Sequence, residues 1–366
     1  ESNFNKTSEI IISGNSLSGF TLVSKEKTGI QFQNDLPLEK SLSNQVYLNG
    51  SGVAMGDVNN DGLCDIYLCR LDGSNHLYLN KGGWRFNEVA EDFGVDCSEI
   101  DSTGASFADL DGDNDLDLIV NSVNSETRLF RNDGDKFKQI YLEPKNTSIA
   151  GGTSIAIADI DGNGLLDFYV THYRDSTLMD MPNTDFKFRN TQGRKEIYSV
   201  NGIEVKGSKF ENRFRINNKG GIEENGLPDV LYYNMGEMKF ARSLVEGNRF
   251  QDSQGVPIKK ALYDWGLAAM FRDINQDGKP DLYVCNDFDT EDRLWLNIGK
   301  GKFREAPLYA LRKTSMFSMG VDFADINRDS LDDFIVLDML NRNRGTRQNQ
   351  MPPRLKYKSS PGPYLD

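Results

Sequence analysis

Acidic and amide side chains recur in a nine-residue pattern, Asp-x-(Asp/Asn)-x-(Asp/Asn)-x-x-x-Asp, at five places in the chain. Positions 1, 3, 5 and 9 of each copy carry side-chain oxygens, and the main-chain carbonyl of position 7 can supply another. Hard oxygen ligands in a short turn are what Ca²⁺ requires, and flexible cages of carboxylates and carbonyls suit it better than the smaller Mg²⁺. The pattern therefore predicts about five calcium sites.

The predicted ligands fall into five groups, one for each loop. They are Asp57, Asn59, Asp61, Leu63 and Asp65; Asp109, Asp111, Asp113, Asp115 and Asp117; Asp159, Asp161, Asn163, Leu165 and Asp167; Asp273, Asn275, Asp277, Lys279 and Asp281; and Asp325, Asn327, Asp329, Leu331 and Asp333. A single loop could be an Asx-turn that caps a strand end, but five in register favour metal binding. The role is structural, because crowded carboxylates repel each other until a cation relieves the repulsion.

The net charge of the chain is concentrated in these loops. The side-chain ligand positions hold 16 aspartates, whereas the formal net charge of the whole chain is −13. The rest of the sequence is thus not acidic, which argues against a halophile-like surface. It also shows no basic stripe, so nucleic acid is excluded as an expected partner.

The spacing of the loops indicates a repeat architecture. The first aspartates stand at positions 57, 109, 159, 273 and 325, which gives a period near 50 residues and one longer step. We interpret that step as two units with one degenerate copy, in which Glu224–Asp229 is a decayed loop. Residues 172–227 are then an insertion, alone or together with one blade that lacks a usable metal site.

Each unit reads as four short strands. A Gly- and Ala-rich strand enters the acidic loop, an apolar strand leaves it, a third strand ends in Asn, and a fourth begins at a Phe after a Gly-containing turn. This spacing predicts an all-β propeller of about six to seven four-stranded blades, with calcium loops between the first and second strands. The small residues place the entering strand at the crowded centre. A β-sandwich would not explain equal periods.

The two ends of the chain lead to further expectations about its domains. Phe20–Ile30 matches Phe86–Val95, the fourth strand and exit turn of a unit, so it is expected to complete the last blade unless the chain continues beyond this fragment. We expect residues 1–19 to be an N-terminal extension, residues 20–340 to be the propeller, and residues 341–366 to be a tail or a linker to an absent domain. Trp84, Trp265 and Trp295 are expected in the core.

The units GVAMGDVNNDGLCDIYL, GASFADLDGDNDLDLIV and GVDFADINRDSLDDFIV, each followed by a strand ending in Asn, resemble FG-GAP/VCBS repeats, the blades of integrin-α-type propellers. The likeness extends to bacterial secreted relatives of cartilage acidic protein and the ASPIC/UnbV proteins. It implies calcium ligation by the loops. Ser330 replaces the usual loop glycine, and the decayed loop has Gly221 in place of its first aspartate, so we expect weak or absent binding at these two places.

Catalytic residues are harder to find. The links between second and third strands should lie opposite the acidic loops, where His172, Tyr173 and Arg174 form a candidate acid/base cluster. A polar loop with a satisfied histidine is the favoured alternative. The chain has two histidines and no zinc, nucleotide-cradling or Ser/His/Asp spacing.

The leading hypothesis is therefore a non-catalytic, calcium-stabilised propeller that acts in adhesion, ligand binding or complex formation with a protein or glycan ligand. Calcium loops favour an extracellular setting, a bacterial outer-membrane surface or the periplasm. The alternatives are a carbohydrate-active enzyme resembling polysaccharide lyases, and an accessory subunit of an outer-membrane complex held by a partner or a lipid anchor. No apolar run is long enough for a transmembrane segment. One disulfide among Cys64, Cys69, Cys97 and Cys285 is left open.

Overall fold

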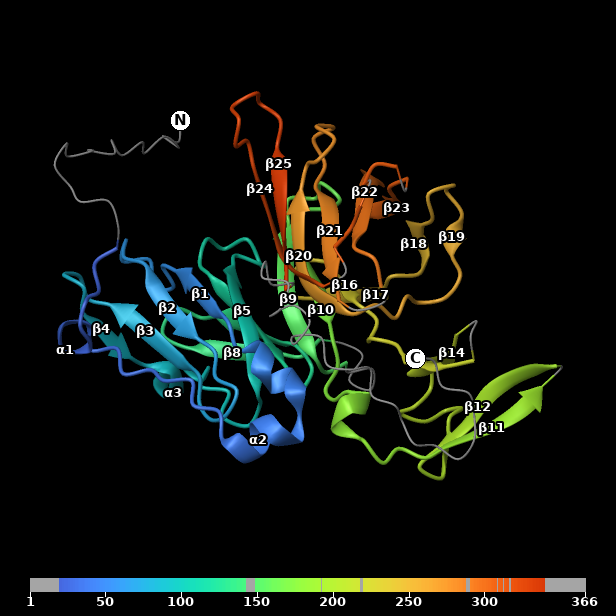
Figure 1. Cartoon of the computed structure of the whole chain (residues 1–366). Coiled ribbons are helices and arrows are strands. Elements are labelled where there is room, and N and C mark those ends of the chain that lie inside the picture. Colours follow the sequence, from blue (N-terminus) through green and yellow to red (C-terminus); the bar gives the residue numbers. More distant parts are fainter. Residues whose placement is uncertain are drawn as a thin grey trace.

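The protein is described here by a computed structural model. It describes residues 20–142, 149–191, 193–217, 220–287, 290–307, 309–311, 313–315 and 317–339. The segments predicted as an N-terminal extension and a C-terminal tail lie outside these residues. The described part is all-β with a few short helices, and it is built mainly from repeated antiparallel sheets (Figure 1).

Five repeat units follow one another along the described chain. Unit 1 contains β1 (Val53–Gly56), β2 (Asp65–Leu68), β3 (His76–Asn80) and β4 (Phe86–Glu88). Unit 2 contains β5 (Ser102–Ala108), β6 (Asp117–Ser122), β7 (Arg128–Asn132) and β8 (Phe137–Ile140). Unit 3 contains β9 (Gly152–Ala158), β10 (Asp167–His172), β16 (Val230–Asn234) and β17 (Phe240–Leu244). Unit 4 contains β20 (Gly266–Arg272), β21 (Asp281–Asn286), β22 (Arg293–Gly299) and β23 (Lys302–Glu305), extended by β18 (Gly247–Gln251) and β19 (Pro257–Ile258); unit 5 contains β24 (Ser318–Ala324) and β25 (Asp333–Asp338). Each acidic loop joins the first strand of its unit to the second, as predicted.

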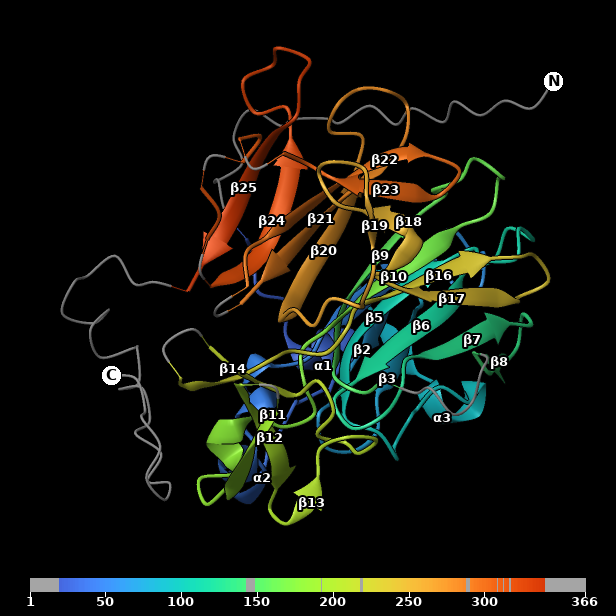
Figure 2. The ribbon, with the colours of Figure 1, turned by 90° about the vertical axis from the view of Figure 1, so that its right-hand side faces the viewer.

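The Gly- and Ala-rich strands lie at the centre, as expected. Strand β1 packs beside β5, β5 beside β9, β9 beside β20, and β20 beside β24, so the units are arranged around an axis (Figure 2). A Cβ atom added to Gly52 of the loop before β1 would lie 2.9 Å from the Cα atom of Gly104 in β5. The backbones approach this closely only because glycine has no side chain.

The described residues between the third and fourth loops form no extra blade, and the prediction of a decayed loop is wrong. Strand β10 pairs with β16, so the third and fourth strands of unit 3 come after the insertion. The region read as a decayed loop follows β15 (Ile222–Glu224) and leads directly into β16. The described residues thus hold five units rather than six or seven. A long excursion between paired strands is tolerated because loop-closure entropy grows slowly with loop length.

The insertion forms a small lobe with its own apolar cluster. It comprises η2 (Leu178–Asp180), β11 (Phe186–Thr191), β12 (Arg194–Val200), β13 (Ile203–Glu204), β14 (Phe214–Ile216) and β15. Leu178, Phe186, Val200 and Phe210 are buried together there. In both views the lobe lies opposite the turn between β24 and β25, which carries the fifth acidic loop (Figures 1 and 2).

The N-terminal segment resembles the end of unit 1 in its short helix but not in the strand expected before it. Helix α1 (Lys25–Thr28) ends at Gly29 just as helix α3 (Ala90–Phe93) ends at Gly94, each in the left-handed conformation. The expected strand before α1 is not formed, however, and Phe20 and Leu22 are fully exposed. The segment instead lies against unit 1, where a Cβ atom added to Gly29 would lie 2.9 Å from the Phe86 carbonyl oxygen of β4. The chain then runs through α2 (Leu38–Ser43) and η1 (Gln45–Asn49).

Apolar side chains from neighbouring units fill the spaces between sheets. Tyr67 and Leu118 pack between units 1 and 2, and Trp295 is fully buried between units 3 and 4. Trp265 is also buried, but Trp84 is exposed in a tight turn with a positive φ, contrary to expectation. All four cysteines are free, so the disulfide left open by the sequence is not formed.

In units 2 to 4 an asparagine at or near the end of the third strand fastens the unit to the preceding one. Asn132 donates through Nδ2 to the Val58 carbonyl of unit 1 (2.8 Å), and its Oδ1 accepts from the Gly134 amide (2.9 Å). Two further asparagines repeat the cross-unit bond: Asn234 to Leu110 O (2.6 Å) and Asn297 to Ile160 O (2.8 Å). The sequence shows this asparagine clearly, but its role depends on how neighbouring blades are placed.

Replacing Asn132 by Ala should lower the free energy of unfolding by about 2–4 kcal/mol, because several buried polar groups lose their partners together. Asn87, which is exposed on β4, provides the matched control, and Asn87→Ala should stay within about 0.5 kcal/mol of wild type. Denaturant titration measures both. Equal effects of the two substitutions would contradict the fastening role.

Candidate metal sites

The acidic loops share one backbone conformation. Positions 4 and 6 have positive φ in every copy, for example Asn60 (55°) and Gly62 (85°) in the first loop. These left-handed residues turn main-chain amides inward: the Gly62 amide donates to Asp57 Oδ2 (2.7 Å) and the Leu63 amide to Asp61 Oδ1 (2.9 Å). Asparagine and glycine adopt this conformation with the least strain, which explains why they recur at these positions.

In units 1 to 4 the aspartate at position 9 is buried and acts as an anchor inside the blade. Asp117 accepts from the Leu110 amide at position 2 (2.8 Å) and from the Asn132 amide of the third strand (2.9 Å). Asp65, Asp167 and Asp281 make the same pair of bonds within their units. Position 9 therefore joins the loop, the second strand and the third strand.

The second and third loops bring three carboxylates together. Atoms of Asp109, Asp111 and Asp117 that could bind a cation lie within 4.8 Å of one another, and Asp159, Asp161 and Asp167 form an equal cluster. Like charges at this separation destabilise one another unless a cation or a proton intervenes.

Unpaired oxygens in the second loop fit a cation. Asp111 Oδ1 and Asp115 Oδ1 are buried atoms without a hydrogen-bond partner among the described residues. Burial, followed by repulsion from neighbouring carboxylates, raises the pKa of Asp115 to about 6, and burial raises that of Asp117 to about 7. Asp115 entered the prediction through its main-chain carbonyl, whereas the structure shows that its side chain also belongs to the cluster. A hard divalent cation would supply the missing partner for these oxygens.

The other three loops carry asparagine at position 3, so each has three aspartates at positions 1, 3, 5 and 9, as the third loop does, and one fewer than the second loop. The Lys279 ammonium in the fourth loop lies 2.8 Å from Asp277 Oδ2. This side chain therefore supplies part of the positive charge that the loop carboxylates need. Ser330 in the fifth loop adopts φ 69° and still donates its amide to Asp325 Oδ2 (2.9 Å). The fifth loop thus keeps the shared geometry despite the loss of glycine, at the expense of some backbone strain.

The candidate acid/base residues lie in the interior. The His172 side chain is 1% exposed, its Nδ1 lies 3.1 Å from the Val170 carbonyl, and burial lowers its pKa to about 3. Tyr173 donates to Asp287 Oδ2 (3.0 Å), and Arg174 donates to the Gly226 carbonyl (2.8 Å) of the insertion. Arg174 thus joins unit 3 to the insertion, whereas Tyr173 joins unit 3 to unit 4.

Asp229 is a buried residue of this junction that the sequence did not single out. Its Oδ1 accepts from the His172 amide (2.8 Å) and its Oδ2 from the Tyr169 hydroxyl (2.8 Å). Burial raises its pKa to about 7. The only signal in the sequence was its place just before a third strand, where Asn75 and Asp292 stand in units 1 and 4.

The low pKa of His172 predicts a pH effect on stability. Its folded pKa of about 3 lies below the ordinary value of about 6.5, so the unfolded chain binds the proton first as pH falls. Between pH 7 and pH 5 wild type should lose about 2 kcal/mol of unfolding free energy that a His172→Gln variant does not lose. Because Asp229 titrates in both proteins, the difference between the two denaturation series isolates the histidine. If wild type and the His172→Gln variant lost the same unfolding free energy between pH 7 and pH 5, the imidazole would be exposed and would titrate normally.

Fold and loops together define a propeller-type repeat protein with acidic loops on one side. The FG-GAP-like repeat matches residues 57–120, 109–170 and 273–336, so the chain is an FG-GAP repeat protein. The overlapping matches span adjacent units and leave out the insertion, in agreement with the observed sheets.

Curated relatives include cartilage acidic protein 1. The Xenopus tropicalis protein is 32% identical over 139 residues, which cover 35% of this chain and 21% of that protein. The human protein is 31% identical over 136 residues, covering 34% and 20%. The aligned region therefore spans only about a fifth of these relatives.

Among solved structures, the Vibrio cholerae biofilm matrix protein Bap1 aligns with a TM-score of 0.37 and 14% identity over 78% of this chain and 34% of that chain. A GH43_1 enzyme from Xanthomonas citri, complexed with xylose, aligns with a TM-score of 0.35 and 10% identity over 74% of this chain and 76% of that chain. Likenesses of this size support no functional argument. No helix in the described part of the chain is both long and apolar enough to cross a membrane.

Proposed function

We propose that this chain is a calcium-stabilised, non-catalytic propeller that presents a binding surface outside the cell. The observation that carries the proposal is the convergence of carboxylates in the second and third loops, where unpaired buried oxygens of Asp111 and Asp115 need a positive partner. Flexible oxygen cages of this kind suit Ca²⁺.

One argument supports the extracellular setting: calcium is abundant outside cells, where weak sites of this type remain filled. The aligned region leaves out about four fifths of the length of the matched relatives, so their own partners are not transferred to this chain. A protein or glycan ligand at the cell surface remains the expected partner.

A catalytic role receives little support from the candidate residues. His172 is buried and held neutral at physiological pH, and Arg174 is 4% exposed and bonded to the insertion. A general acid or base must reach the proton that it transfers, which a side chain closed off by its own fold does not do. The binding role is therefore the better supported function.

Thermal melting tests the proposed cation. In millimolar Ca²⁺ the melting temperature should rise by at least about 10 °C over that in excess chelator, since each site filled at a hundredfold its Kd adds about 2.7 kcal/mol. Mg²⁺ at the same concentration should give a smaller shift. An unchanged melting temperature would rule out structural calcium.

Removing carboxylate charge from the second loop tests whether that loop is a metal site or only a turn. Asp111→Asn with Asp115→Asn should raise stability in chelator by about 1 kcal/mol, because repulsion is relieved, yet reduce the calcium-induced shift. Asp135→Asn, at an exposed carboxylate in the β7–β8 turn, is the control and should change neither quantity. If the loop were only an Asx-turn, the double variant would respond identically with and without calcium.

A further inference from the structure

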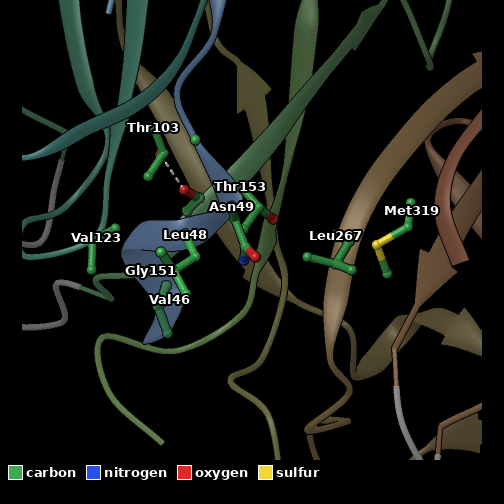
Figure 3. A pocket seen from close by; sticks show the side chains of 11 residues that line it. Val46, Leu48, Asn49, Thr103, Val123, Gly151, Thr153, Leu267 and Met319 are labelled. Carbon is green, nitrogen blue, oxygen red and sulfur yellow. Dashed lines mark hydrogen bonds between the residues drawn. The ribbon is translucent and has the colours of Figure 1, made fainter. Parts of the chain in front are cut away.

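A cavity of about 390 Å³ opens at the axis of the units, at the end of the inner strands away from the acidic loops (Figure 3). Thr103, Thr153, Leu267 and Met319 line it from four units, and each stands six residues before the first aspartate of its loop. The repeat therefore presents one equivalent position from each of these units to a common space. Helix η1 closes one side of it.

The lining divides into a polar and an apolar side. The Thr103 hydroxyl donates to the Gly152 carbonyl (2.5 Å) and the Thr153 hydroxyl to the Gly266 carbonyl (2.9 Å). Thr153 Oγ1 also lies 2.9 Å from Thr171 Oγ1, so each of the two threonine oxygens keeps at least one lone pair for an incoming donor. Leu267, Met319 and Leu48 supply the apolar side. No charged side chain is among the residues that line the cavity.

Asn49 of η1 is the adaptable polar group of the cavity. Its side chain is exposed, has no hydrogen bond to another described residue, and lines the cavity together with Thr153 (Figure 3). The amide offers both a donor and an acceptor to a ligand.

The segment that carries Asn49 is firmly held. The Tyr47 hydroxyl donates to Asp101 Oδ2 (2.6 Å), and the Gln45 amide donates to Asp180 Oδ1 (2.9 Å) of the insertion. Val46 is buried in an apolar cluster with Tyr173 and Trp265. A polar group without a partner on a fixed support is the arrangement expected of a preformed binding site.

We propose that this cavity binds a single neutral sugar residue of a glycan. A pyranose ring has hydroxyls at its edge for Asn49 and the two threonines, and C–H faces for Leu267 and Met319. A charged ligand would lose its hydration without gaining a counter-charge, and a purely aliphatic ligand would leave the amide and hydroxyl groups unpaired. The cavity lies at the small end of the usual range for ligand pockets, which suits one ring. This assignment rests on the proposed binding function and gives its ligand class.

The test uses the full chain in calcium with methyl-labelled Met, Leu and Val side chains followed by NMR. Methyl glucoside and methyl galactoside are the neutral probes, and methyl glucuronide and cyclohexanol are the charged and apolar comparisons, each added to about 50 mM. Saturable shifts of the Met319 and Leu267 methyls with a neutral glycoside, weaker or absent with the comparisons, support the proposal. No saturable shift with either neutral glycoside, or equal binding of a comparison compound, overturns it.

Variants locate the site. Asn49→Ala should weaken glycoside binding about fivefold by removing one donor–acceptor group, and Met319→Ala should weaken it by removing apolar contact. Both side chains are exposed, so folding should be retained, and Asn87→Ala on β4 is the matched control. Unchanged binding in both variants would overturn the assignment. A normal calcium-dependent melting shift without glycoside binding would reject the ligand class and leave the calcium scaffold in place.

Discussion

The buried aspartate at position 9 of the first four acidic loops is the group on which the blades depend. In units 1 to 4 this carboxylate is fully buried and joins the position-2 amide to the main chain of the third strand. The asparagine bonded to it in units 2 to 4 also donates to the preceding unit, so the local anchor extends around the axis. Burial raises the pKa of Asp117 to about 7 and of Asp167 to about 6, because the charged form of each carboxylate is disfavoured away from water.

A second set of polar anchors stands at the other end of the same strands. Asn75 and Asp292 each accept from a main-chain amide at the end of the second strand, at Arg70 and at Asn286 respectively, and each is hydrogen-bonded to a buried tyrosine hydroxyl. Asp229 occupies this place in unit 3, where it accepts from the His172 amide and the Tyr169 hydroxyl. The two ends thus differ in chemistry: carboxylate clusters suited to cations at one, and neutral or fully bonded groups around a central cavity at the other. The carboxylate clusters that hold the loops thus lie at one end, and the surface proposed for recognition lies at the other.

The sequence predicted the features that depend on local pattern. The loop motif, the strand order within a unit and the central position of strands such as β5 follow from spacing and small residues. It failed where the answer depends on pairing over long distances. Strand β16 reads like the third strand of any unit, and only its pairing with β10 assigns it to the blade begun before the insertion. Phe20 and Leu22 read like a strand, but no partner strand lies beside them among the described residues.

The candidate site was predictable in part for the same reason. Carboxylates at fixed spacing identify the loops, whereas the burial of His172 and the cavity beside Asn49 arise only when several units and η1 come together.

Hydrogen exchange of the amides bonded to position 9 tests the central account most directly. The amides of Val58, Leu110, Ile160 and Ile274 donate to these buried carboxylates, and peptides spanning the four loops report on them together. If cations hold the loops that fasten the blades, protection in all four should fall sharply when calcium is replaced by chelator and return when calcium is restored. Equal protection in calcium and in chelator would contradict the account.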